Sequence, residues 1–335
     1  MIRVLGIETS CDETALAIAV KDGGAVQVVK SLVASQINIH KKYGGVVPEV
    51  AARNHALLLP ALLKKILGRE RERAFDAIAV TAGPGLITSL RVGTDAARTL
   101  SLIWRKPLIA INHLEGHIFA NWIEAEESPR FPALALIVSG GHTELVLMRR
   151  FGDYIRLGAT RDDAAGEAFD KVAKILCLGY PGGPKVADEA RRGNPGAIAL
   201  PRPMIKSNDF DFSFSGLKTA VLLAANAKKW KRADICASFE QAVIDVLIAK
   251  SVRAAQTLNP RSFLLAGGVA ANNKLRREIK KALLRRAPKV AYFEPRLEYT
   301  TDNAAMIAVA GCFAGRDHEA DWQKLEPRAQ WEIGV

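Results

Sequence analysis

Two histidines, His113 and His117, stand four residues apart in the stretch 112–122. The apolar run 107–111 predicts a buried strand before them, and Asn112 is a suitable N-cap for a helix that follows. Side chains at positions i and i+4 share one helix face, so the two imidazoles could bind one metal ion. The alternative is that both histidines cap the helix or face solvent.

Glu115 lies between the histidines and is predicted to point away from their face, about 200° around the helix. In the H-E-x-x-H motif of zinc proteases, the glutamate directly follows the first histidine and acts on a zinc-bound water. The position of Glu115 therefore argues against a metalloprotease. Asp302 could complete a two-histidine, one-carboxylate site of the kind that holds non-haem iron. Its spacing suits an N-cap of the last helix better.

Three turns rich in Gly, Ser and Thr follow predicted strands, at 9–14, 139–143 and 267–268. Such turns expose backbone N–H groups and let phosphate oxygens approach, so together they could grip a nucleotide. Each one alone could equally be a tight turn. The sequence has no G-x-x-x-x-G-K-[ST] motif, which excludes a P-loop protein.

Carboxylates accompany these turns. Asp12 and Glu13 lie in the first turn, where an acidic group serves a cation, a catalytic step or an Asx-type turn. Glu167 and Asp170 are three residues apart in the acidic stretch 161–171, so they could present two carboxylates on one helix face.

The composition describes a large basic protein. The chain has 335 residues, 49% of them hydrophobic, which is enough for two cores. Its four cysteines are dispersed, which argues against a zinc knuckle or a disulfide framework and favours a reducing cytoplasm. Neither a signal peptide nor a membrane span is predicted. The net charge of +12 favours a polyanionic partner, nucleic acid first. The basic helix 274–286 is either a solvated surface helix or a phosphate contact.

Alternating strand and helix patterns predict an α/β fold with mixed sheets flanked by helices. Two predicted hairpins have the same build, with Thr14 and Thr143 opening the return strands, and they suggest two related lobes. Helices are predicted at 48–67, 86–104, 164–176, 233–258, 274–286 and 301–313. The segments 179–184 and 208–216 are predicted to be a turn and a loop.

Ten motifs spread along the chain together resemble the bacterial branch of the TsaD family, the tRNA threonylcarbamoyladenosine synthases. The motifs occupy 6–14, 43–49, 83–86, 112–117, 138–143, 162–171, 180–184, 212–218, 266–269 and 301–303. The resemblance implies a two-lobed, actin-like ATPase (ASKHA) fold. Residues 1–130 would form the N-terminal lobe and 131–300 the C-terminal lobe, with a helix at about 301–320 packing back on the first.

The same resemblance implies a site. His113, His117 and Asp302 would bind one metal ion, Fe²⁺ or alternatively Zn²⁺. Asp12 is the candidate catalytic residue, which would assist proton removal. The adenylate part of the substrate would be held by Ile137, Val138, Ser139, Gly140, Gly141, Asp170, Gly183 and Asn272. Further candidates for the site are Ser10, His142, Glu167 and Asp188.

The implied activity is a metal-dependent acyl transfer. The threonylcarbamoyl group of threonylcarbamoyl-AMP would pass to N6 of the adenosine next to the anticodon, in tRNAs that read codons starting with A. The implied partners are tRNA, a TsaB-like paralogue, a TsaE-like ATPase with Mg²⁺ and ATP, and a TsaC/Sua-type synthase that supplies the adenylate. A basic surface that includes Lys41 and Lys42 would steer the tRNA. The rival functions are a simple actin-like ATPase or sugar kinase and a non-catalytic tRNA-binding scaffold.

Overall fold

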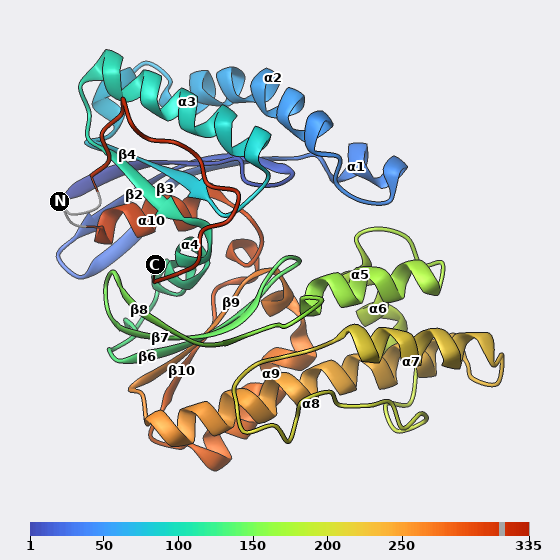
Figure 1. Cartoon of the computed structure of the whole chain (residues 1–335). Helices are drawn as coiled ribbons and strands as arrows, with labels where there is room; N and C mark the ends of the chain where they lie inside the picture. Colours follow the sequence, from blue (N-terminus) through green and yellow to red (C-terminus); the bar gives the residue numbers. More distant parts are fainter. Residues whose placement is uncertain (315–318, 335) are drawn as a thin grey trace. The chain divides into compact units, whose positions relative to one another are not determined.

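The computed structural model describes residues 1–314 and 319–334, and it divides the chain into two compact units. Unit 1 comprises Met1–Ser128 and Pro295–Val335, and unit 2 comprises Pro129–Glu294. Each unit has a five-stranded sheet with helices packed on it (Figure 1). Within the described residues, no helix is both long enough and apolar enough to cross a membrane.

The sheet of unit 1 has the strand order β3-β2-β1-β4-β5. β1 pairs antiparallel with β2 and parallel with β4, while β5 continues the parallel side. All seven residues of β4 are buried, as expected of a strand covered on both faces. The bounds are β1 (Ile2–Glu8), β2 (Glu13–Asp22), β3 (Ala25–Ser35), β4 (Ala77–Gly83) and β5 (Leu108–Asn112).

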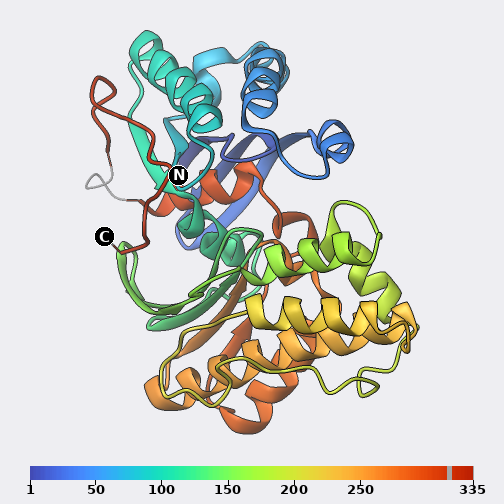
Figure 2. The ribbon, with the colours of Figure 1, turned by 45° about the vertical axis from the view of Figure 1, so that its right-hand side comes forward.

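Helices cover both faces of this sheet. α2 (Pro48–Leu67) and α3 (Ile87–Trp104) pack side by side against the face that carries Leu5 and Ile7 (Figures 1 and 2). α10 (Ala304–Phe313) packs against the other face. The shorter elements are α1 (Ile37–His40), α4 (His113–Phe119), η1 (Lys41–Tyr43), η2 (Arg71–Ala74), η3 (Ala120–Trp122) and η5 (Leu297–Tyr299).

Gly6 of β1 allows α10 to lie directly on the strand. A Cβ atom at Gly6 would stand only 2.3 Å from the carbonyl oxygen of Ala304 and 2.9 Å from the Cβ of Ala308. α10 is therefore held against β1 at a distance that only glycine permits. This packing fixes the start of α10, next to Asp302.

The sheet of unit 2 has the order β10-β9-β6-β7-β8. Three consecutive antiparallel strands, β6 to β8, are followed by two parallel ones, as β1 to β3 are followed by β4 and β5 in unit 1. The predicted internal repeat and the predicted α/β class are confirmed. The bounds are β6 (Ala133–Val138), β7 (Thr143–Arg150), β8 (Asp153–Ala159), β9 (Ser262–Ala266) and β10 (Ala291–Phe293).

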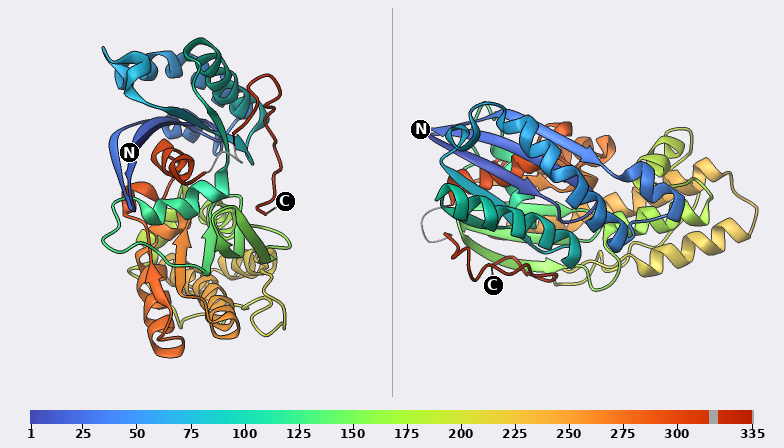
Figure 3. Two further views of the ribbon diagram at one scale, coloured as in Figure 1. Left: turned by 90° about the vertical axis from the view of Figure 1, so that its left-hand side faces the viewer. Right: turned by 90° about the horizontal axis from the view of Figure 1, so that it is seen from above.

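Helices of unit 2 share one large core with the sheet, which includes Leu134, Phe169, Phe239 and Phe263. α8 is the longest helix of the described chain, and α9 lies along it (Figure 3). The bounds are α5 (Ala165–Ile175), α6 (Gly182–Ala190), α7 (Ser215–Asn226), α8 (Arg232–Leu258), η4 (Gly268–Ala271) and α9 (Asn273–Arg286).

Three predictions of local structure need correction. The predicted turn 179–184 contains the start of α6 at Gly182, because the carboxylate of Asp170 accepts the Gly182 N–H and holds a Gly-Gly-Pro start in helical form. The predicted loop 208–216 ends in α7, which begins at Ser215. The last helix begins at Ala304 and ends at Phe313, the end that the sequence pattern predicts; the segment of about 301–320 that the resemblance implies is longer than this helix, and its residues 315–318 lie outside the described residues.

Candidate active site

The two histidines of α4 and Asp302 come together in unit 1. Asn112 caps α4 by accepting the N–H of Leu114 at 2.9 Å, which starts the helix directly at His113. Nε2 of His117 lies 3.2 Å from Oδ1 of Asp302, and Nε2 of His113 lies 3.5 Å from the same oxygen. Both histidines are buried, so the alternative of solvent-facing histidines is wrong.

Asn303 rather than Asp302 caps the last helix. Its side-chain oxygen accepts the N–H of Met306 at 3.0 Å. The carboxylate of Asp302 is therefore available to face the two histidines, and the N-cap role expected for Asp302 from its spacing is wrong. The packing of α10 on β1 places Asp302 beside α4, although 189 positions separate it from His113.

These three side chains fit a metal ion. Two imidazole nitrogens and one carboxylate oxygen lie within 4.8 Å of one another. Within the described chain, Nδ1 of the buried His117 has no hydrogen-bond partner, and Nε2 has only its 3.2 Å ion-pair contact with Asp302, which is not a hydrogen bond of good geometry; this is costly for a buried polar group. A metal ion bound by His117 would remove that cost, and two histidines with one carboxylate are a set that suits iron or zinc.

Glu8 lies on the other side of His113. Its side chain is fully buried at the end of β1, and Oε2 lies 3.2 Å from Nδ1 of His113. Oε2 also accepts the hydroxyl of Thr81 at 2.6 Å, and Oε1 accepts the N–H of Ser10 at 2.6 Å. The hydroxyl of Ser10 is 3.2 Å from the same His113 nitrogen. These contacts fix the His113 ring so that Nε2 faces Asp302.

In this cluster, the pKa values of His113 and Glu8 are shifted by each other's charge and by that of Asp302. Burial alone lowers the pKa of His113, but the carboxylates of Asp302 and Glu8 outweigh burial and raise it to about 9. Burial raises the pKa of Glu8, yet the charge and hydrogen bond of His113 hold it below its ordinary value. The two carboxylates on either side of His113 therefore favour a positive charge at this position.

The first turn, which carries Asp12 and Glu13, adjoins this cluster electrostatically. Burial, then the charge of Asp302, then Asp12 raise the pKa of Glu13 to about 9. The Asp12 side chain is buried, and its backbone carbonyl accepts the N–H of Gln36 at 2.9 Å.

His55 of α2 supports the same turn from behind. Its Nε2 lies 3.0 Å from the carbonyl oxygen of Cys11, and its Nδ1 lies 2.7 Å from the hydroxyl of Thr14. The imidazole is fully buried. One side chain therefore joins both ends of the turn, and this holds Asp12 in place.

The residues expected to hold the adenylate all lie in unit 2, around the carboxyl ends of the parallel strands β6 and β9. Ile137 and Val138 are the last residues of β6, and their side chains are fully buried. Ser139, Gly140 and Gly141 form the turn after that strand, and a Cβ atom at either glycine would meet no atom within 4 Å. The glycines leave open space beside exposed backbone, which suits a phosphate or sugar.

Three further segments, α5, α6 and η4, pack around this turn or against one another beside it. The N–H of Gly166 in α5 donates to the carbonyl of Ser139 at 3.1 Å. Asp170 of α5 accepts the N–H of Gly182 at 2.7 Å, which ties in the start of α6 with Gly183. η4 contacts both α5 and β6, and it is followed by Asn272. The expected adenylate residues thus form one cluster within unit 2.

Comparison with known proteins agrees with this geometry. Residues 27–309 match the family described as TsaD: tRNA N6-adenosine threonylcarbamoyltransferase. The chain belongs to the TsaD family. A relative named tRNA N6-adenosine threonylcarbamoyltransferase, from Anaeromyxobacter dehalogenans (strain 2CP-1 / ATCC BAA-258), is 50% identical over 99% of this chain and 100% of its own. One of the same name from Thermosipho africanus (strain TCF52B) is 49% identical over 92% of this chain and 93% of its own.

A solved structure outside these relatives shares the fold of this TsaD family member. The crystal structure of T. kodakarensis HypF superposes with a TM-score of 0.61 and 16% sequence identity. The match covers 93% of this chain and 47% of HypF, so the chain spans about half of that protein. At this identity the likeness supports the duplicated α/β fold alone.

The remaining candidates have individual partners. Ser10 contacts His113 and Glu8 in unit 1, as described above. The backbone N–H of His142 donates to the hydroxyl of Ser139 at 3.1 Å, so it shapes the turn. Glu167 forms an ion pair with Lys171 at 2.8 Å. Asp188 forms an exposed ion pair with Arg191 at 3.4 Å.

Sequence reasoning missed Glu8, although the first strand of the TsaD motif carries it. A carboxylate at the end of an apolar strand is usually the point where the strand meets solvent. Its partners Thr81 and His113 lie 73 and 105 positions away, so no local spacing could reveal the contact. The one available signal was that the apolar run 4–7 of β1 ends at this charge.

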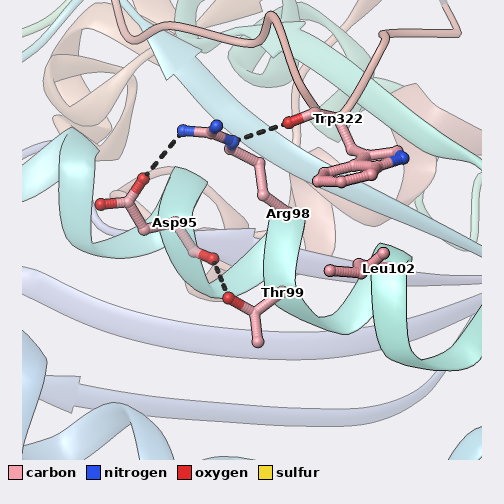
Figure 4. Close-up of a pocket in the computed structure, with 5 residues that line it drawn as sticks. All are labelled: Asp95, Arg98, Thr99, Leu102 and Trp322. Atoms are coloured by element: carbon pink, nitrogen blue, oxygen red, sulfur yellow. Dashed lines mark hydrogen bonds and ion pairs between the residues drawn. The ribbon is translucent and has the colours of Figure 1, made fainter.

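A surface depression of about 210 Å³ on α3 is separate from these residues. It is lined by Asp95, Arg98, Thr99, Leu102 and Trp322 (Figure 4). The guanidinium of Arg98 donates to the carbonyl of Trp322 at 2.7 Å and forms an ion pair with Asp95 at 3.3 Å. These contacts attach the C-terminal segment to α3. No nucleophile or metal-binding cluster lines the depression.

Proposed function

We propose that this protein transfers the threonylcarbamoyl group from threonylcarbamoyl-AMP to N6 of an adenosine in tRNA, with release of AMP. The acceptor is the adenosine next to the anticodon in tRNAs that read codons starting with A. The observation that carries the proposal is the match to relatives named for this activity along nearly the whole chain. The buried cluster of two histidines and Asp302 supports it, because the ATPase or scaffold alternatives have no use for such a cluster.

The reaction needs three functions from the protein. The N6 amine of adenosine attacks the carbamoyl carbon, a C–N bond forms, and the bond from that carbon to the AMP phosphate oxygen breaks. The amine loses a proton, and AMP leaves with the electron pair. The site must therefore hold the AMP part, orient the carbamoyl group and accept the proton.

Unit 2 would hold the AMP part. The Ser139–Gly141 turn offers backbone N–H groups beside open space, and Asp170 fixes the start of α6 with Gly183. Asn272 begins the next helix. Ile137 and Val138 end β6 directly before this turn, and their buried side chains anchor its start in the core.

In unit 1, His113, His117 and Asp302 would bind one Fe²⁺ or Zn²⁺ ion. Such an ion supplies Lewis-acid polarisation of an oxygen atom and a template for the substrate. Glu8 and Ser10 keep the His113 ring oriented for that role. The cluster prefers positive charge, as the raised pKa of His113 indicates.

Asp12 is the proposed proton acceptor. Its side chain is buried in the first turn, which His55 of α2 holds in place. We expect Asp12→Asn to lower turnover while adenylate binding survives; loss of binding instead would make Asp12 a substrate contact.

The proposed setting is the cytoplasm. The proposed partners are a TsaB-like subunit, a TsaE-like ATPase that uses Mg²⁺ and ATP, and a TsaC/Sua-type synthase that makes the adenylate. These assignments rest on membership of the family.

The decisive experiment is a transfer assay. Purified protein with its bacterial partners receives unmodified tRNA and threonylcarbamoyl-AMP, and the nucleosides are analysed by mass spectrometry. We expect threonylcarbamoyladenosine from the wild type and none from His113→Ala. If the wild type binds metal and adenylate yet forms no product, the enzymatic proposal is wrong and a scaffold or simple ATPase is favoured.

A further inference from the structure

The net positive charge of the chain comes from unit 2 alone. Unit 2 contains 28 Lys and Arg residues against 15 Asp and Glu, which gives a net charge of +13. The rest of the chain contains 19 against 20. A generally basic surface would distribute the excess over both units. The whole excess therefore calls for an explanation within unit 2.

Nearly half of this excess lies on α9. Its 14 residues include seven Lys and Arg and a single Glu. Leu275, Ile279 and Leu283 are buried on the side that packs against α8. The exposed cations of the helix and the residues just after it form what we call the α9 basic face: Arg277, Lys280, Lys281, Arg285, Arg286 and Lys289.

The α9 basic face has almost no internal neutralisation. Lys274 and Arg276, nearer the start of the helix, form ion pairs with Glu240 and Glu294. Of the α9 basic face, Arg277 alone has an ion pair among the described residues, a 3.9 Å contact with its neighbour Glu278. The other five cations are therefore available to a partner.

Helix stability does not account for this pattern. Arg285 and Arg286 lie in the last turn, where cations interact favourably with the helix dipole. Arg277 and Lys281 lie earlier, and like charges at i and i+4 repel one another along a helix. Arg277, Lys281 and Arg285 form a row with a rise of about 6 Å between successive members. Such a row costs the free chain stability and suits a linear array of negative charges.

The residue that caps α9 also belongs to the expected adenylate site. Asn272, which is expected to contact the adenylate, caps α9 by accepting the N–H groups of Lys274 and Leu275 at 2.9 Å. The row of cations therefore extends from the end of the expected adenylate cluster within the same unit. A polyanion bound along it would lead to that cluster.

We propose that the α9 basic face binds the sugar-phosphate backbone of the tRNA substrate. The contact is electrostatic and independent of base sequence, so it contributes affinity and position rather than choice of codon. The inference rests on the proposed function for the identity of the polyanion. It assigns the binding surface to the helix that the sequence left open as a phosphate contact, and not to Lys41 and Lys42 of unit 1.

The test measures binding of an unmodified tRNA transcript to the full chain over a range of salt concentrations. The test variant is Arg277→Gln/Lys281→Gln/Arg285→Gln. The matched control is Lys228→Gln/Lys229→Gln/Lys231→Gln, which removes the same charge from another exposed stretch of unit 2. We expect the α9 variant to bind at least about tenfold more weakly at low salt, with a log–log salt slope smaller by about 2. The control should stay within about twofold of wild type.

Three results would overturn the proposal. Wild-type affinity in the α9 variant would exclude this face. An equal loss in the control would show diffuse attraction by unit 2. A loss with Lys41→Gln/Lys42→Gln alone would place the tRNA on unit 1. Unchanged AMP binding and a thermal midpoint at or slightly above that of wild type show that the α9 variant is folded.

Failure of the proposed function is distinguishable from failure of this inference. In the transfer assay, the α9 variant should raise the KM for tRNA and leave kcat near wild type at saturating tRNA. A wild type that binds tRNA through α9 but forms no product would refute the activity alone. Full activity at low tRNA concentration in the α9 variant would refute the surface alone.

Discussion

Oε2 of Glu8 and Nδ1 of His113 lie 3.2 Å apart, and the Glu8 side chain is fully buried. The contact orients one expected metal ligand through its second nitrogen, and carboxylate partners of this kind strengthen metal binding. Nδ1 of His117, the corresponding nitrogen of the other histidine, has no hydrogen-bond partner in the described chain. The second ring nitrogen of His113 is therefore held by the Glu8 carboxylate, whereas the second ring nitrogen of His117 is held by no side chain of the described residues.

Replacement of that carboxylate should weaken the metal site. We expect Glu8→Gln, which keeps the shape and removes the charge, to lower Zn²⁺ or Fe²⁺ affinity by about 10- to 100-fold. Competition with a chromophoric chelator measures the affinity without any need for activity. Glu126→Gln, at an exposed position of the same unit, is the control. Equal affinity in Glu8→Gln and wild type would remove Glu8 from the site.

A methyl group at Gly6 should separate α10 from β1. Gly6→Ala places Cβ 2.3 Å from the Ala304 carbonyl, so the helix must move. We expect a loss of about 1–3 kcal/mol in the free energy of unfolding, together with weaker metal binding as Asp302 shifts. Urea unfolding and the chelator assay measure the two effects. Gly24→Ala is the control, because its Cβ would meet nothing within 4 Å. The prediction fails if both substitutions behave alike.

His55 should make stability depend on pH. Burial lowers its pKa below the ordinary value of 6.5, although the hydrogen bond with the Cys11 carbonyl acts in the opposite direction. Near and below pH 6.5, His55 therefore binds a proton more readily in the unfolded chain than in the folded chain. The stabilisation from neutral His55 is fully present above pH 6.5 and is lost as the pH falls below that value.

The difference in urea midpoint between wild type and His55→Gln separates the titration of His55 from that of the other groups. Urea midpoints are measured from pH 7.5 to 5.5 for wild type and His55→Gln. We expect the gap between them to narrow as the pH falls, since the variant has no imidazole to protonate. Parallel curves would mean that His55 is not the responsible group.

Asp162 should act as a remote N-cap for α7. It accepts the N–H groups of Phe214 and Ser215 and the hydroxyls of Ser213 and Ser215, at 2.5 to 3.3 Å. Burial raises the pKa of Asp162, but these hydrogen bonds lower it further, so it is a carboxylate at neutral pH. We expect Asp162→Ala to cost about 0.5–2 kcal/mol of stability and to speed proteolysis near residues 207–215. Asp188→Ala, at an exposed ion pair, should change neither.

The sequence predicted most regular elements because their signals are local. α2 begins at Pro48 and ends before Gly68, as a proline in the first turn and a glycine after the last predict. α6 escaped prediction because Gly182, Gly183 and Pro184 are ordinary turn residues, and a carboxylate twelve positions away stabilises the helix start. β8 escaped because an edge strand, half-exposed between Asp153 and Ala159, has a weak alternation.

The residues of the candidate site also differ in whether local sequence could predict them. The spacing of His113 and His117 predicted a shared metal ion from the residues alone. Asp302 required the family resemblance, because its local sequence favoured an N-cap that Asn303 in fact provides. Glu8 could not be found at all, since its role depends on a contact between β1 and α4 that no short motif encodes.

The discontinuity of unit 1 has a consequence for biosynthesis. Asp302 leaves the ribosome 189 residues after His113, a delay of about 10–40 s at about 5–20 residues per second. During that interval the nascent chain contains β1 to β5 without α10, while all of unit 2 is synthesised. A chain released early in this interval retains both histidines and never acquires the third ligand. All three ligands, His113, His117 and Asp302, can therefore bind a metal ion only after residue 302 has been translated.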